Sequence, residues 1–232
     1  MPMTPATMTD RGLLALARHE GLVPAPYLDS VHTWTFGIGH TAAAGGPDPA
    51  TMPRGMPTDL DAGIREAFRV FRVDIARYEA EVRNAITVPL TPHEFDALVS
   101  FHYNTGGIAR AVLTRHLNAG NRVAAANAFM GWRKPAAIIP RREAEQRLFR
   151  DGHYPGGTIP VWAVDRAGHV DFARPIRSLT ERDALVLMRP EPTLSAPTST
   201  PSPQSPRAPA PDTPNGWLAR LTAFLTTLIR RT

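Results

Sequence analysis

Three polar residues near the start of the chain, Glu20, Asp29 and Thr35, lie on what the sequence indicates are adjacent elements. Glu20 ends an apolar helical pattern, Asp29 opens a segment rich in aromatic and β-branched residues, and Thr35 lies within that segment. A protonated carboxyl and an ionised carboxylate together can cleave a glycosidic bond, and a nearby hydroxyl can help hold the attacking water. The same residue types are also common on ordinary surfaces, so the local pattern alone leaves both interpretations open.

The elements that must position these residues can be placed from periodicity and capping signals. Thr9 or Asp10 can cap a helix that stops at Gly21. Residues 27–41, broken by glycines, are typical of a short β-hairpin or meander. Apolar residues recur at helical spacing in several later segments, which predict a long helix over 58–85, a helix that begins at Thr91, and shorter helices over 109–118, 122–132 and 141–150.

These elements predict an α+β fold that is mainly α-helical, with a small sheet near the start. After the last of these helices the pattern changes. Residues 156–187 contain what we predict to be two short strands around 166–168, and 180–188 could form a last short helix. No chemical role for this region follows from its residues.

Composition excludes several functional classes. The 232 residues contain no cysteine, which excludes disulfides, cysteine-ligated metal and a thiol nucleophile. The net charge of +5 favours a polyanionic partner, which could be nucleic acid, an acidic wall polymer or an anionic membrane. No nucleic-acid-binding motif is present, so we expect no specific nucleic-acid partner, and no metal or organic cofactor is implied.

The prolines divide the chain into three parts. Nine of the 24 prolines fall in residues 190–214, which read as an extended linker after a globular domain, residues 1–189. Residues 215–232 predict an amphipathic helix with a basic polar face. We expect its apolar stripe to contact an anionic membrane, although docking on the domain or pairing with another chain stays open; the stripe includes Trp217, Leu221, Phe224 and Leu228.

Three blocks resemble the phage-type lysozymes, the endolysins of glycoside hydrolase family 24. In that family eight residues separate a glutamate from an aspartate, and five more separate the aspartate from a threonine. Glu20, Asp29 and Thr35 have this spacing, and Gly-Ile-Gly-His-Thr follows at 37–41. Residues 88–106 resemble the opening of the family's C-terminal lobe, and 141–154 resemble its closing helix. The resemblance covers residues 10–154 and leaves 155–189 as an extension.

The resemblance implies a two-lobed lysozyme fold, with the long helix joining the lobes and a cleft between them. It implies hydrolysis of the β-1,4 bond between N-acetylmuramic acid and N-acetylglucosamine in peptidoglycan, and thereby bacterial lysis. Glu20 would be the general acid, Asp29 the second carboxylate, and Thr35 would help position water. Arg141 corresponds to a family arginine that pairs with the catalytic glutamate, although it could instead lie on a solvated helix face.

Three further residues are candidates for supporting roles. His32 stands where the family usually has a glycine of positive φ, so it alters the hairpin tip and could affect substrate fit. His40 matches the histidine of the family's Gly-x-Gly-His, which suggests a structural hydrogen-bonding role rather than a catalytic one. Asn104 could face the sugar or cap a turn.

Two alternatives to the muramidase remain open at this level: a lytic transglycosylase that cuts the same bond, and a non-catalytic wall- or membrane-binding protein on a lysozyme scaffold. The N-terminus has no basic start followed by a long apolar run, so we expect no signal peptide. The resemblance implies synthesis in the host bacterial cytoplasm and release to the wall or periplasm with a holin. We expect a monomer.

Overall fold

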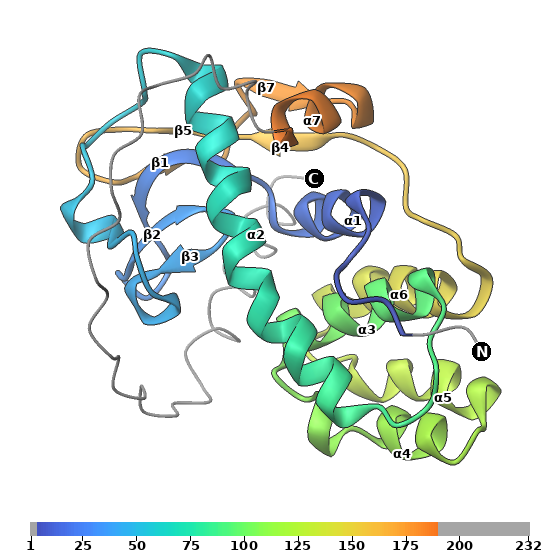
Figure 1. The fold of residues 1–232 in the computed structure, drawn as a ribbon. Helices are drawn as coiled ribbons and strands as arrows, with labels where there is room; N and C mark the ends of the chain where they lie inside the picture. Colours follow the sequence, from blue (N-terminus) through green and yellow to red (C-terminus); the bar gives the residue numbers. More distant parts are fainter. Residues whose placement is uncertain (1–3, 190–232) are drawn as a thin grey trace, which may run out of the picture.

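The computed structural model describes residues 4–189, which form two lobes joined by one long helix (Figure 1). The expected linker, 190–214, and the expected amphipathic helix, 215–232, with its candidate membrane-contacting residues, lie outside the described residues. Within residues 4–189, none of the helices combines the length and the apolar character that crossing a membrane requires.

The first lobe begins with helix α1 (Asp10–Glu20) and a small antiparallel sheet. The Thr9 side chain caps α1 by accepting from the Gly12 amide, and Gly21, at φ 70°, ends the helix. Strands β1 (Val23–Leu28), β2 (Trp34–Gly37) and β3 (His40–Thr41) pair in sequence order as a meander, so both predictions for this part of the chain are confirmed.

Helix α2 (Leu60–Ala85) runs from this lobe into the second (Figure 1). The Asp59 side chain caps it by accepting from the Ala62 amide, so the helix begins two residues later than the sequence predicts. One face of the helix is buried along its whole length, and it contributes Ile64, Phe68, Phe71, Ile75 and Val82 to the core.

The second lobe is helical. It contains α3 (Pro92–Thr105), α4 (Val112–Asn118), α5 (Arg122–Ala128) and α6 (Ile139–Asp151). The capping box predicted at Thr91 is present, and α3 packs against α6. Helix α4 begins later and α5 ends earlier than predicted, whereas α6 extends beyond its predicted bounds at both ends. Ala111 is extended, which delays α4, and the chain tightens into a 3₁₀ turn after Ala128.

The 3₁₀ turn places two aromatic rings in the core of the helical lobe. Phe129 and Trp132 each lie 5.4 Å, centroid to centroid, from the ring of Phe101 in an edge-to-face arrangement. Such aromatic contacts stabilise a core beyond the area that they bury. Local periodicity alone predicts that the helix continues through these residues. The packing of the two rings favours the 3₁₀ turn instead.

The C-terminal extension (residues 155–189) returns from the helical lobe to the lobe that holds the sheet (Figure 1). The two predicted strands are β5 (Ala163–Val164) and β6 (Val170–Asp171), and the last helix, α7 (Glu181–Met188), is confirmed with Thr180 as its cap. The prediction of only two strands is wrong, because β4 (Ile159–Val161) pairs with β7 (Arg177–Leu179). Strands of three residues have too little periodicity to be recognised in the sequence.

The burial of residues on α2 predicts how much each of two substitutions on this helix lowers the free energy of unfolding. Phe71 is buried, and its ring lies 5.8 Å from that of Tyr103. Phe71→Ala should therefore lower the free energy of unfolding by about 3–5 kcal/mol, as large cavities in cores do. Val73, 60% exposed on the same helix, is the control, and Val73→Ala should change it by less than about 0.5 kcal/mol. Urea denaturation measures both; equal losses would contradict the assigned packing.

Candidate active site

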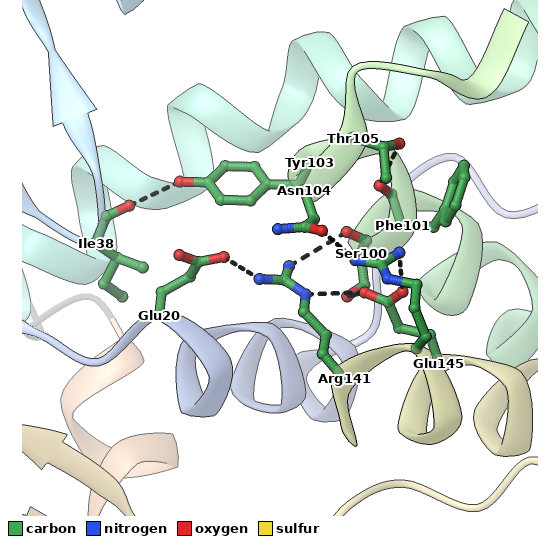
Figure 2. Close-up of polar contacts among 10 residues, drawn as sticks. Glu20, Ile38, Ser100, Phe101, Tyr103, Asn104, Thr105, Arg141 and Glu145 are labelled. Carbon is green, nitrogen blue, oxygen red and sulfur yellow. Dashed lines mark hydrogen bonds and ion pairs between the residues drawn. The ribbon is translucent and has the colours of Figure 1, made fainter. Parts of the chain in front are cut away.

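Glu20 is the last residue of α1, and its carboxyl group points toward α6 of the other lobe (Figure 2). Its Oε1 accepts a hydrogen bond of 2.6 Å from Nη1 of Arg141. The Glu20 side chain keeps 15% of its surface exposed, whereas that of Arg141 keeps 4%. The carboxyl group is therefore held by a buried cation and is still reachable by a substrate.

Arg141 is itself fixed by two other groups of the helical lobe. Its Nε donates to Oε1 of Glu145 at 3.0 Å, and its Nη2 donates to the Ser100 carbonyl at 3.3 Å. The Ser100 hydroxyl donates to the same Glu145 oxygen at 2.7 Å. Figure 2 shows this chain of contacts from Glu20 through Arg141 to Glu145. The contact with Glu20 that the resemblance implies is present, and a solvated position for Arg141 is wrong.

Arg142 adds a second buried cation to the same group. It pairs with Glu145 and donates to Oδ1 of Asn104. Burial, only partly offset by the charge of Glu145, lowers the pKa of Arg142 to about 10, so the guanidinium remains charged at neutral pH. The site thus contains two guanidinium groups and two carboxyl groups in close contact. Asn104 is buried, and its carbonyl oxygen is engaged within the lobe.

Two more titratable side chains lie near Glu20. The Tyr103 hydroxyl donates to the Ile38 carbonyl at 2.8 Å, as Figure 2 shows. Burial, reinforced by the charge of Glu20, raises the pKa of Tyr103 well above its ordinary value, so it remains a hydrogen-bond donor. Burial and the charge of Arg141 lower the pKa of His19 to about 3, so this ring is neutral beside Glu20.

Asp29 and Thr35 lie on one face of the β1–β2 hairpin. Tyr27 pairs with Thr35 in the sheet register, and successive side chains alternate between faces, so Asp29 and Thr35 point to the same side. Oδ1 of Asp29 accepts from the amides of Val31 and Thr33 at 3.0 and 2.9 Å, which fixes the carboxylate in the turn. Thr35 is buried, and its hydroxyl donates to the Thr33 carbonyl at 3.1 Å.

His32 occupies the tip of this hairpin with φ 58°, and it is the one non-glycine residue between 4 and 189 with a positive φ. It therefore has the positive φ that the family's glycine normally supplies, and the expected change of the hairpin tip is not seen in this angle. Its amide donates to the Asp29 carbonyl at 3.0 Å, and its side chain is exposed. A role of this side chain in substrate binding stays a prediction.

His40 lies on the opposite face of the sheet from Thr35. It pairs with Phe36, the neighbour of Thr35 on β2, and it is 1% exposed. Its Nδ1 lies 2.9 Å from a carboxylate oxygen of Asp74, and its Nε2 lies 2.6 Å from the Pro47 carbonyl. This geometry agrees with the structural hydrogen-bonding role and places His40 away from the face that carries Asp29.

Three residues of the site, Glu145, Ser100 and Tyr103, were not predicted from the sequence. Glu145 follows Arg141 by four residues and Arg142 by three, and pairs at these spacings share one helix face, which was the available signal. Ser100 and Tyr103 carry no comparable signal, because only the packing of α3 on α6 brings Ser100 to Arg141. Within residues 4–189, no group of three or more histidine, cysteine, aspartate or glutamate side chains could hold a metal ion.

Comparisons with known proteins identify the class of this fold and site. The sequence profile of the Phage lysozyme family matches residues 17–145. The endolysin of Salmonella phage P22 is 32% identical over 148 residues, which cover 61% of this chain and 97% of that protein. The fold and the family are therefore those of a peptidoglycan-lytic enzyme of the lysozyme type. The chain belongs to the phage lysozyme family.

Two solved structures are similar to the same part of the chain. The endolysin from Escherichia coli O157:H7 phage FAHEc1 superimposes with a TM-score of 0.56 at 30% identity, over 64% of this chain and 96% of that one. The muramidase domain of SpmX from Asticaccaulis excentricus gives 0.51 at 26% identity, over 62% and 97%. The family match ends at residue 145, so the C-terminal extension lies outside it.

The contact between His40 and Asp74 predicts a pH dependence of stability. Burial alone would lower the pKa of His40, but the hydrogen bonds to Asp74 and the Pro47 carbonyl, with the charges of Asp74 and Asp48, raise it above the ordinary value of 6.5. A raised folded-state pKa gives stabilisation that is complete below about pH 6.5 and is lost as the pH rises through the folded-state value. Asp74→Asn should therefore cost more stability at about pH 5 than at about pH 9.

Urea denaturation at the two pH values measures this difference. Glu66→Gln is the control, because it removes a partly exposed carboxylate of α2 that pairs with an exposed arginine, Arg69. Glu66→Gln should lower the free energy of unfolding by a small amount that is equal at both pH values. A loss for Asp74→Asn that is the same at both pH values would show that His40 is not charged in the folded state.

Proposed function

We propose that the protein is a muramidase that hydrolyses the β-1,4 bond between N-acetylmuramic acid and N-acetylglucosamine in peptidoglycan. The observation that carries the proposal is the partly exposed Glu20 carboxyl held at 2.6 Å by buried Arg141, with Asp29 at the far end of the strand that follows. Two carboxyl groups on either side of a glycosidic bond are what this hydrolysis requires. The muramidase domain among the similar structures supports the same reaction.

In this proposal Glu20 donates a proton to the leaving oxygen as the general acid. Arg141 holds the carboxyl group in place while the proton is transferred. While Glu20 is protonated, Arg141 keeps a counter-ion in Glu145, with which it makes a hydrogen bond of 3.0 Å. Arg141 therefore keeps one charged partner in both protonation states of the acid, and it shares that partner with Arg142.

Asp29 supplies the second carboxylate, on the face that it shares with Thr35. The amides of Val31 and Thr33 restrict its rotation, so the carboxylate is oriented before the substrate arrives. In the proposal Thr35 helps to hold a water beside Asp29. The product is a reducing end that contains the oxygen of that water.

Glu20→Gln tests the acid role. The amide keeps the shape and the hydrogen-bond acceptor for Arg141 but has no acidic proton to transfer, so clearing of purified murein should fall at least about 100-fold. The circular dichroism spectrum should not change. Glu143→Gln, an exposed position on α6, is the matched control and should clear murein at the rate of the unaltered chain. Retained activity in Glu20→Gln refutes the assignment.

Product analysis separates the hydrolase from a lytic transglycosylase. Mass spectrometry of digested murein should show hydrolysed ends, which are one water heavier than the anhydro ends that a transglycosylase leaves. Asp29→Asn should also remove activity, because the hydrolase needs both carboxyl groups. A fully active Asp29→Asn variant with anhydro products would assign the transglycosylase reaction instead, and absence of any cleavage by the unaltered chain would leave only wall binding.

We further propose that the chain acts as a monomer on the wall after release with a holin, and that residues 215–232 contact anionic membrane. The sequence pattern supports the membrane contact, because Leu221 lies on the apolar stripe and Thr226 on the polar side. Leu221→Asp in the full chain should reduce co-sedimentation with phosphatidylglycerol vesicles several-fold. Thr226→Asp adds the same charge off the stripe and should reduce it less. Equal binding by both variants and the unaltered chain would exclude the contact.

A further inference from the structure

Strand β1 connects the two proposed catalytic carboxyl groups, yet it pairs only partly with β2. The register between the strands is irregular from Val23 to Tyr27, and regular pairing returns only at Tyr27. The sheet therefore holds β1 weakly along the stretch that separates Glu20 from Asp29.

The C-terminal extension contacts the beginning of β1 on its other edge. The Leu22 amide donates to the Pro160 carbonyl at 3.0 Å, and the Trp162 amide donates to the Leu22 carbonyl at 2.9 Å. These bonds form a parallel bridge between Leu22 and Val161. Leu22 lies two residues after Glu20, so the backbone next to the proposed acid is tied to the extension.

The extension also contacts the end of β1. The Leu28 amide donates to the Gly168 carbonyl at 2.8 Å, and Leu28 directly precedes Asp29. Gly168 lies in the turn between β5 and β6 with φ 92°, and a Cβ there would lie 2.7 Å from the indole ring of Trp34. Because the Arg54 guanidinium lies over that ring, 3.4 Å from its centroid, the indole has little freedom to move away.

Side-chain contacts hold the extension in this position. Trp162 and Val164 are buried in one cluster with Val23 and Ala25 of β1. At the start of the extension, Nη1 of Arg18 donates to the Pro155 carbonyl at 2.8 Å, and its Nε donates to the Gly157 carbonyl at 3.0 Å. Arg18 belongs to α1, so the extension is anchored to the helix of Glu20 as well as to the strand before Asp29.

We propose that residues 155–171 of the extension position Glu20 and Asp29 relative to each other, with Gly168 as the positioning residue beside Asp29. This inference rests on the proposed function, since it assigns to the extension the geometry of those two carboxyl groups. It gives a role to the region for which the sequence alone indicated none. The family match, which ends at residue 145, does not include this region.

Gly168→Ala tests the proposal, with Gly120→Ala as the matched control. Both glycines have positive φ, 92° and 79°, so both variants incur a similar backbone strain, but a Cβ at Gly120 meets no atom within 4 Å. Gly168→Ala should lower the rate of murein cleavage at saturating substrate by about 10- to 100-fold, because small displacements of catalytic groups are costly. Gly120→Ala, which adds the backbone strain without the clash, should keep that rate.

Hydrogen exchange at Leu28 gives a readout independent of activity. Its amide should exchange faster in Gly168→Ala than in the unaltered chain and Gly120→Ala. Unchanged exchange, or faster exchange with an unchanged cleavage rate, overturns the proposal. If the unaltered chain does not cleave murein, the proposed function fails, and the exchange comparison alone then decides whether the extension holds β1.

If Gly168→Ala does not fold, Asp165→Ala takes its place. Asp165 is exposed, and its Oδ1 accepts from the His169 amide at 2.9 Å, so its loss loosens the turn that presents Gly168 without adding an atom. The cleavage rate should fall and exchange at Leu28 should rise, each by less than in Gly168→Ala. Values equal to those of the unaltered chain overturn the proposal.

Discussion

The ion pair between Glu20 and Arg141 is the contact on which the rest of the site depends. It joins α1 to α6 across 121 residues. It also fixes Glu20, whose carboxyl group is partly exposed, against the buried Arg141. A buried guanidinium is costly unless it is compensated, and Glu145 and Ser100 supply that compensation from within the helical lobe. The two lobes must therefore pack in one arrangement for the proposed acid to be held.

The second carboxyl group depends on a different constraint, which is the path of the backbone. Asp29 is oriented by amides of its own turn, but the position of that turn follows from β1. Because the pairing of β1 with β2 is irregular from Val23 to Tyr27, the backbone bonds from the extension at Leu22 and Leu28 add support at both ends of β1. The proposed site is thus built from one side-chain contact between lobes and one backbone contact between strand and extension.

Much of the fold could be predicted because its signals are local. Thr9 and Gly21 mark the ends of α1, and the capping box at Thr91 marks the start of α3, since each satisfies backbone groups of the nearest turn. The sequence did not predict that His32 keeps the positive φ of the family's glycine, because its tolerance of that angle depends on the turn around it. The strands β4 and β7 were not foreseeable, because each is short and pairs with a distant partner.

The sequence by itself determined the spacing of Glu20, Asp29 and Thr35, the helix boundaries near capping residues, and the family. These features depend on residues close together in the chain. Only the tertiary structure decided that Arg141 reaches Glu20 and that the Gly168 carbonyl meets the backbone before Asp29. The reason is physical: contacts between distant segments form only after the lobes and the extension have packed, and no local periodicity encodes which surfaces will meet.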